Sequence, residues 1–230
     1  MSLDPKIISA KEAADLIPDG ATVMFGGFVG AGSALDVIDE LAQTGKKMTA
    51  IWNDSSKQNG PDGSEYYSWA KLIHNRQIPH YIGSHLGTNP EASAMQASGE
   101  MQVDLVPQGS LAEMIRAGGM GLGGVITPTG VGTLVEESPY VERKIEIDGK
   151  EYLIMKPLHA DYAVLCGAKV DKLGNVWYHG SARNFNPLMA YAADHVIVEA
   201  EELVEVGEIG PDDVATPGIL VDYIVVRGQK

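Results

Sequence analysis

The sequence predicts an α/β fold built on a largely parallel, open sheet that is flanked by helices. Three observations support this class: the apolar run 21–25 is rich in strand formers, the segment 26–32 after it is rich in glycine, and apolar residues then recur at three-residue spacing over 35–41, as on one face of a helix. The apolar run 47–52 indicates a second strand, and two strands joined through a helix pair in parallel. Such sheets place their ligand sites at the carboxyl ends of the strands.

The size and composition of the chain favour one domain. It has 230 residues, of which 44% are hydrophobic, so it can bury a full core. No stretch rich in Pro, Gly or Ser, and no run of like charges, is long enough to act as a linker. We therefore expect a single domain over residues 1–230.

Local signals predict where two helices begin. Ser9, followed three residues later by Glu12, has the spacing of a capping box, and the helix that it starts should end at Pro18. Ser33 follows the glycine-rich segment and is expected to cap the next helix.

The rest of the chain predicts further strands, a hairpin and a loop. Asp148-Gly149 lies between alternating apolar residues over 144–155, which predicts a β-hairpin outside the main sheet. The polar segment 55–67 is expected to be a surface loop. Strands are expected at 79–83, 103–106, 162–165 and 195–198, and helices at 111–117 and 187–193.

The charge balance excludes some classes of partner. The formal net charge is −14, and an acidic surface repels nucleic-acid backbones and anionic lipid headgroups, so we expect neither nucleic acid nor a membrane as partner. The single cysteine, Cys166, lies in an apolar run and is interpreted as a small core residue. With no signal-peptide pattern at the N-terminus and no apolar run of about 18 residues, the expected location is the cytoplasm.

The glycine-rich segment 26–32 is the first candidate binding site. Glycines between a strand and a helix let the backbone approach a ligand and turn amide groups and the helix N-terminus toward an anion, such as the phosphates of coenzyme A. The same glycines are equally compatible with a tight turn and no ligand.

A dinucleotide-binding site is the main alternative. Asp54 lies roughly 20 residues beyond the glycine segment, as a ribose-binding acid would, but the segment 30–35 lacks the third glycine of that fingerprint. A second cluster, Gly119 to Gly124, has the glycine spacing, but it follows a helix-like segment and leads to Pro128. No Gly-x-Ser-x-Gly elbow and no histidine pair at metal-ligand spacing occurs, so neither a serine hydrolase nor a metal site is expected. Two alternatives stay open: an NAD(P)-dependent oxidoreductase, and a non-catalytic subunit that binds coenzyme A or a sugar phosphate.

Several blocks of the chain match one known family. The stretch 19–32, Asp-Gly-Ala-Thr-Val-Met-Phe-Gly-Gly-Phe-Val-Gly-Ala-Gly, resembles the N-terminal signature of the family I CoA transferases. Blocks at 83–91, 107–111, 116–121, 127–133, 181–186 and 216–218 are similar to those of the alpha subunit, in the same order. One departure is Ala34, where the family signature usually has proline. The resemblance covers essentially the whole chain and implies a CoA transferase/NagB-like fold.

The resemblance also implies an activity and a partner. Family members move coenzyme A between carboxylic acids by a ping-pong reaction, through a glutamyl-CoA thioester. The reactive glutamate belongs to a beta subunit, within a Ser-Glu-Asn-Gly motif that is absent here, so this chain is expected to be inactive alone. The block 83–91 resembles the branch that acts on acetate, acetoacetate and butyrate. Coenzyme A is then a substrate, and no permanently bound cofactor is expected.

Site residues follow partly from the resemblance and partly from position. By resemblance, the side-chain amide of Gln108 helps form the oxyanion site for the thioester together with backbone of the partner, where an amide donor can contribute roughly 3 kcal/mol. The alternative is that this side chain only satisfies the backbone of its own loop. The CoA-binding residues are expected in the glycine segment, and Asn53, at the end of a predicted strand, is expected to line the acyl pocket. Glu91 is interpreted as a helix-terminal charge, and Arg183 either as an anion-binding residue or as part of a buried ion pair. The expected CoA-binding residues are Gly26, Gly27, Phe28, Val29, Gly30, Ala31 and Gly32.

Overall fold

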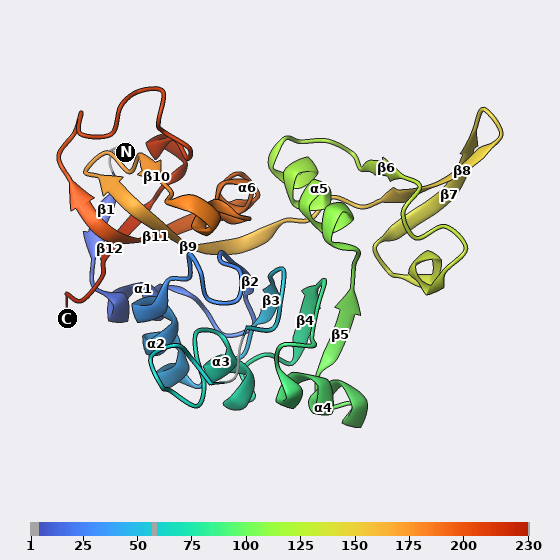
Figure 1. The fold of residues 1–230 in the computed structure, drawn as a ribbon, viewed down its shortest axis with the longest axis horizontal. Coiled ribbons are helices and arrows are strands. Elements are labelled where there is room, and N and C mark those ends of the chain that lie inside the picture. Colours follow the sequence, from blue (N-terminus) through green and yellow to red (C-terminus); the bar gives the residue numbers. More distant parts are fainter. Residues whose placement is uncertain (1–4, 57–58, 230) are drawn as a thin grey trace.

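A largely parallel open sheet forms the centre of the computed structural model, which describes residues 5–56 and 59–229 (Figure 1). Eight strands lie in the order β1-β12-β11-β9-β2-β3-β4-β5, every neighbouring pair is parallel, and the two-residue strand β10 adds to β9 in the antiparallel sense. The predicted fold class is confirmed. The strands are β1 (Lys6–Ile8), β2 (Thr22–Phe25), β3 (Thr49–Ile51), β4 (His80–Gly83), β5 (Gln102–Leu105), β9 (Ala160–Asp171), β10 (Val176–Trp177), β11 (Ala193–Val204) and β12 (Tyr223–Val226).

Helices cover both faces of the sheet (Figure 1). Because side chains alternate along a strand, Val23 and Phe25 of β2 pack into one hydrophobic cluster and Met24 packs into the other. The first cluster includes helices α1 (Ala10–Leu16), α2 (Leu35–Thr44), α3 (Ala70–His74) and α4 (Pro90–Ser98), and the second includes α5 (Gln108–Gly119) and α6 (Asn186–Tyr191). Two buried layers of this kind are typical of α/β domains.

The two capping predictions have opposite outcomes. Ser9 and Glu12 form the full capping box at the start of α1, with the Glu12 amide 3.2 Å from Ser9 Oγ. Ser33 does not cap α2: its hydroxyl is buried and has no hydrogen-bond partner among the described residues. The first-turn amides of α2 donate instead to the carboxylate of Glu199, on β11. Local spacing cannot reveal a cap that comes from so far along the chain.

The predicted hairpin is confirmed and belongs to a larger element. Strands β7 (Val141–Ile147) and β8 (Lys150–Met155) are joined by Asp148 and Gly149, both at positive φ, as a two-residue type I′ turn requires. Strand β6 (Val125–Thr127), which the sequence did not predict, pairs with β8 and completes a three-stranded antiparallel sheet. This sheet projects away from the main one (Figure 1).

The segment 55–67 is only partly the surface loop that was expected. Ser55 and Ser56 are buried, and Ser56 Oγ donates to the carbonyl oxygen of Tyr67 at 2.9 Å. Residues 57–58 lie outside the described part of the chain. The other predicted strands and helices are all present, although β9 and β11 extend to 12 residues each and α5 begins three residues earlier than expected. Within residues 5–56 and 59–229, no helix is long and apolar enough to cross a bilayer.

Candidate active site

The glycine segment lies where the strand order of the sheet reverses. The chain runs from β2 outward through β3, β4 and β5, then returns to the other side of β2 with β9. At such a switch point the connections leave in opposite directions, and a crevice opens at the carboxyl ends of the strands. The segment 26–32 follows β2 directly, so it lies at this switch point.

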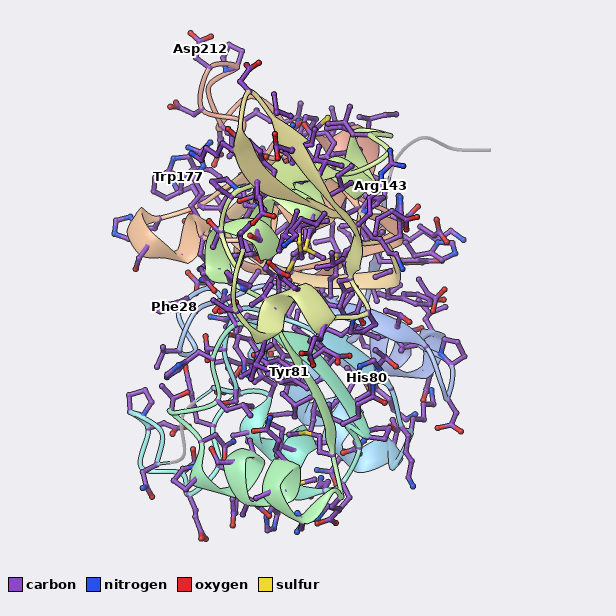
Figure 2. All side chains as sticks on the ribbon, turned by 90° about the vertical axis from the view of Figure 1, so that its right-hand side faces the viewer. Phe28, His80, Tyr81, Arg143, Trp177 and Asp212 are labelled. Atoms are coloured by element: carbon purple, nitrogen blue, oxygen red, sulfur yellow. The ribbon has the colours of Figure 1, made fainter. Side chains whose placement is uncertain are left out.

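A tight turn forms the tip of the glycine loop, residues 26–32. Phe28 and Ala31 exchange two backbone hydrogen bonds, at 3.0 and 2.9 Å, around Val29 and Gly30. Both central residues have positive φ, 49° and 88°, which is usual for glycine and strained for a β-branched residue such as Val29. The Phe28 side chain is 47% exposed and lies at the molecular surface (Figure 2). The tip therefore presents an exposed apolar ring at the carboxyl edge of the sheet.

The block 181–186 supports the glycine loop from the side of α6. Asn184 accepts from the Gly27 amide through Oδ1 and donates to the Ala31 carbonyl through Nδ2, each at 3.1 Å. Asn186 is fully buried and donates to the Gly32 carbonyl at 3.1 Å. The sequence pointed to this block by resemblance but gave its two asparagines no role, because nothing local shows that they reach residues more than 150 positions away.

Asp54 holds the glycine loop from the side of β3. Its buried carboxylate accepts from the Val29 amide at 2.9 Å and from the Ser56 amide at 2.6 Å. Burial raises the pKa of Asp54, and the two amide donors oppose that shift. A carboxylate engaged in this way is not free to bind a ribose, so the feature that favoured a dinucleotide site is structural.

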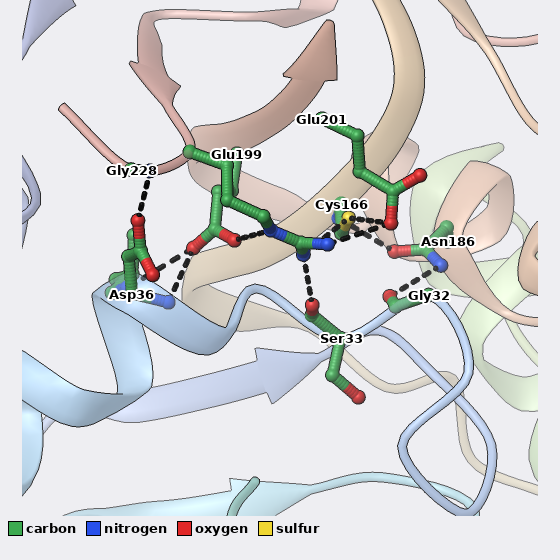
Figure 3. A network of polar contacts seen from close by, with 10 residues as sticks. Gly32, Ser33, Asp36, Cys166, Asn186, Glu199, Glu201 and Gly228 are labelled. Carbon is green, nitrogen blue, oxygen red and sulfur yellow. Dashed lines mark hydrogen bonds and ion pairs between the residues drawn. The ribbon is translucent and has the colours of Figure 1, made fainter. Parts of the chain in front are cut away.

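The expected anion site at the start of α2 is occupied by the protein itself. Glu199 Oε2 accepts from the amides of Asp36 and Val37, at 2.8 and 3.1 Å (Figure 3). The amides of residues 26–29 and 31 also donate to acceptors within the chain. These amides are therefore satisfied within the chain. The role of residues 26–32 in binding coenzyme A stays a prediction.

A row of hydrogen bonds joins the glycine loop to Gln108. Asn53 Nδ2 donates to the Gly27 carbonyl at 2.5 Å, and the Ser84 amide donates to the Asn53 carbonyl at 3.3 Å. Ser84 Oγ then contacts both that carbonyl and the side-chain oxygen of Gln108. Gly27, Asn53, Ser84 and Gln108, from four neighbouring strand ends, are thus brought together, and Ser84 is the member that the sequence gave no role.

Gln108 is placed to donate a hydrogen bond outward. It is exposed, it is the first residue of α5, and it follows β5 at the carboxyl edge of the sheet. The hydroxyl of Ser84 has one proton, so it donates to only one of its two neighbours. Whichever way the Gln108 amide is oriented, at least one of its N–H groups has no partner among the residues described. Such a group can donate to an oxyanion in the crevice.

Asn53 has a different environment from Gln108. Its side chain is fully buried, and its Oδ1 atom has no hydrogen-bond partner within the described residues. The donor side of this amide is used to fix the Gly27 carbonyl. The geometry therefore gives Asn53 a supporting position beneath the glycine loop.

The surroundings of Glu91 and Arg183 test the roles that the sequence suggested for them. Asn89 caps α4, and Glu91 lies in the first turn, where it pairs with Arg76 at 2.6 Å; the interpretation of Glu91 as a helix-terminal charge is confirmed. Arg183 is exposed and has no ion pair with any described residue, so the buried pair considered for it is wrong. Cys166 is buried, as expected, and burial raises its pKa to about 12.

One surface hollow adjoins the row of hydrogen bonds at Gln108, and others lie elsewhere on the described part of the chain. One of about 370 Å³ adjoins Gln108 and is lined by residues of α5 and β6, including Gly109, Ser110 and Ile126. A second, of about 320 Å³, lies beside Trp177 at the far end of β9. No group of three or more His, Cys, Asp or Glu side chains in the described ranges could hold a metal ion. The site formed by this chain is therefore an open surface at the carboxyl edge.

Comparison with known proteins gives one consistent family. The model for coenzyme A transferases matches residues 7–227. The chain is 46% identical to the acetate CoA-transferase subunit alpha of Escherichia coli K12, and 44% identical to the acetoacetyl-CoA:acetate/butyrate CoA transferase alpha subunit of Clostridium acetobutylicum. These matches cover 98% and 97% of this chain and 98% of each relative.

Solved structures show the same fold. An acyl-CoA transferase from Escherichia coli O157:H7, in a thioester complex with CoA, superposes with a TM-score of 0.86 at 23% identity, over 99% of this chain and 48% of that one. This chain therefore spans about half the length of that transferase. The sequence relatives and the shared fold lead to one conclusion: the chain belongs to the coenzyme A transferase family.

Proposed function

We propose that this chain is the alpha subunit of a short-chain acyl-CoA:carboxylate CoA transferase, acting on acetoacetate, acetate or butyrate in the cytoplasm with a beta subunit that carries the reactive glutamate. The observation that carries the proposal is the position of Gln108, exposed at the carboxyl edge and joined through Ser84 and Asn53 to the glycine loop. Names of relatives supply the substrate class: acetate in one, acetoacetyl-CoA with acetate or butyrate in another.

The proposed chemistry proceeds in two displacements. The partner's glutamate carboxylate attacks the thioester carbonyl of the acyl-CoA, and negative charge develops on the thioester oxygen, to which Gln108 Nε2 donates. The C–S bond breaks and releases CoA thiolate, leaving an acyl-glutamyl anhydride. The thiolate then attacks the glutamyl carbonyl, which expels the acid as its carboxylate and leaves glutamyl-CoA. The acceptor acid reverses these steps. No step changes an oxidation state, so the steps need no redox cofactor.

The glycine loop and Asn53 complete the proposed site. Phe28 and Ala31 are exposed at the loop tip, so they can contact the pantetheine arm or the acyl group, while the other loop residues hold that tip in place. Asn53 acts on the acyl pocket by fixing the Gly27 carbonyl. A pocket distinguishes one methylene from none by only about 1–3 kcal/mol, so several short acids can share the site.

A mass measurement on the mixed subunits tests this division of labour. Incubation with acetoacetyl-CoA and no acceptor acid should add the mass of CoA less one water to the partner chain and leave this chain unmodified. A CoA adduct on this chain would contradict the proposal. NAD(H) titration of the same sample tests the oxidoreductase alternative and should show no saturable binding.

A further inference from the structure

An ionic network lies at the point where the glycine loop leads into α2 (Figure 3). Its centre is Arg227, which follows β12 and has a side chain that is 27% exposed. The guanidinium donates from Nε to Glu199 and from Nη1 to Glu201, each at 2.6 Å, and from Nη2 to the carbonyl oxygen of Ser33 at 2.8 Å. The last bond fixes the point where the glycine loop enters α2.

Glu199 extends the network to the first turn of α2. Its side chain is fully buried, with one oxygen bound by Arg227 and the other by the amides of Asp36 and Val37. Every partner of Glu199 is a donor, so only the ionised carboxylate satisfies the site. A buried carboxylate is stable only when paired and hydrogen-bonded, so removing Arg227 would leave Glu199 uncompensated beneath the loop.

A further backbone contact fastens the same turn. The Gly228 amide donates to Asp36 Oδ2 at 2.6 Å. Cys166 Sγ lies 3.1 Å from Arg227 Nη2, but its raised pKa keeps the thiol neutral, so the guanidinium forms its ion pairs with the two glutamates. The segment after β12 is therefore tied to the exit of the glycine loop through side-chain and backbone bonds.

The opposite end of the loop has separate supports. Gly27 is held through its amide by Asn184 and through its carbonyl by Asn53. Between Gly27 and Ser33 the tip has exposed residues at Phe28 and Ala31. A loop fixed at both ends keeps its tip in one position, which lowers the entropy cost of binding a ligand there.

We propose that Arg227 and Glu199 are positioning residues for acyl-CoA binding, because they fix the exit of the glycine loop. This inference rests on the proposed function, in which the tip contacts acyl-CoA. It assigns no chemical step to either residue. Its consequence is selective: loosening the exit should weaken binding of acyl-CoA and leave the acceptor acid, which enters after CoA is covalently attached, largely unaffected.

The test compares two arginines with similar contacts. Arg76, like Arg227, donates to two glutamates and one backbone carbonyl, but it lies between α3 and β4, away from the loop. Arg227→Lys keeps the positive charge, but an ammonium group cannot reproduce the planar guanidinium that donates to Glu199, Glu201 and the Ser33 carbonyl together. In the reconstituted complex we expect Arg227→Lys to raise the KM for acyl-CoA about tenfold, with the KM for acetate within about twofold. Arg76→Lys should change neither value.

Hydrogen exchange supplies a readout that does not need activity. Arg227→Lys should speed exchange in the peptide covering 26–37 and leave that covering 80–100 unchanged, whereas Arg76→Lys should spare 26–37. If Arg227→Lys speeds exchange at 26–37 but the wild-type mixture has no transferase activity, the proposed function is contradicted, while the role of Arg227 in fixing the end of the glycine loop is supported. An unchanged KM for acyl-CoA in an active, intact complex would overturn the positioning role, as would an equal rise in Arg76→Lys.

Discussion

The backbone amide of Val29 donates to the buried carboxylate of Asp54 at 2.9 Å. This bond links the end of β3 to the turn at the tip of the glycine loop, and it helps to hold Val29 at a φ of 49°. A β-branched residue in that region is strained by an amount of order 1–3 kcal/mol. The strain persists because Asp54 on one side and Asn184 on the other fix the loop around it.

Replacing Val29 should therefore stabilise the fold. Asparagine tolerates positive φ and keeps the amide that Asp54 binds, so Val29→Asn should raise the free energy of unfolding by about 1 kcal/mol and the Tm by about 2–4 °C. Calorimetry measures both. Val206 is 54% exposed and has no positive φ, so Val206→Asn is the matched control and should leave the Tm unchanged. A lower Tm in Val29→Asn would show that the turn is not strained.

The buried Asp54 predicts a pH dependence of stability with a definite sign. Burial raises its pKa above the value of 3.8 expected in the unfolded chain, so between the two the folded state binds more protons. The contribution of Asp54 to stability should thus grow as the pH falls through the raised pKa. The Tm of the wild type minus that of Asp54→Asn should be larger near pH 4 than near pH 8.

Asp62 is the control, because its contribution to stability should change with pH in the opposite direction. The hydroxyl and amide of Ser64 lower the pKa of the exposed Asp62, so its contribution is present above the unfolded pKa and is lost as the pH falls through the folded one. The Tm difference between the wild type and Asp62→Asn should be smaller near pH 3 than near pH 8. If both variants showed the same slope, burial would not control Asp54.

The contact between Ser84 and Gln108 predicts coupled effects on catalysis. Gln108→Ala should lower kcat about 10²–10³-fold in an intact complex, the effect of removing one oxyanion donor. Gln96, exposed on α4, is the matched control, and Gln96→Ala should have the wild-type kcat.

Ser84→Ala removes only the group that orients the Gln108 amide, so we expect a fall of about tenfold. Because Ser84 acts through Gln108, the double variant should resemble Gln108→Ala alone, and steady-state kinetics on the four proteins complete the cycle. If the fold-reductions in kcat of the two single variants multiplied in the double variant, Ser84 would not act through Gln108.

The sequence predicted the features that depend on neighbouring residues. The capping box of Ser9 and Glu12 and the turn at Asp148-Gly149 are local, and both are confirmed. The parallel sheet was predicted from one strand-helix-strand unit, since that connection favours parallel pairing, and β2 and β3 are parallel. Gln108 was named through a family resemblance, and its exposure at the carboxyl edge agrees with the proposed role.

The features that the sequence did not predict depend on distant contacts. Glu199 caps α2 from 163 residues away, and Asn186 reaches Gly32 across 154. No periodicity or spacing encodes such pairs, so Ser33 was the best local candidate for the cap and was wrong. Strand β1, at one edge of the sheet, and its neighbour β12 were not predicted, although both are as short as strands that were.

The central claim is that this chain needs a beta subunit for activity. The most direct test measures the consumption of acetoacetyl-CoA in the presence of acetate, with this chain alone, with its beta-subunit partner alone, and with both. We expect turnover only in the mixture, because the reactive glutamate and the Gln108 amide come from different chains. Turnover by this chain alone would contradict the account, since the nucleophile would then lie within residues 1–230.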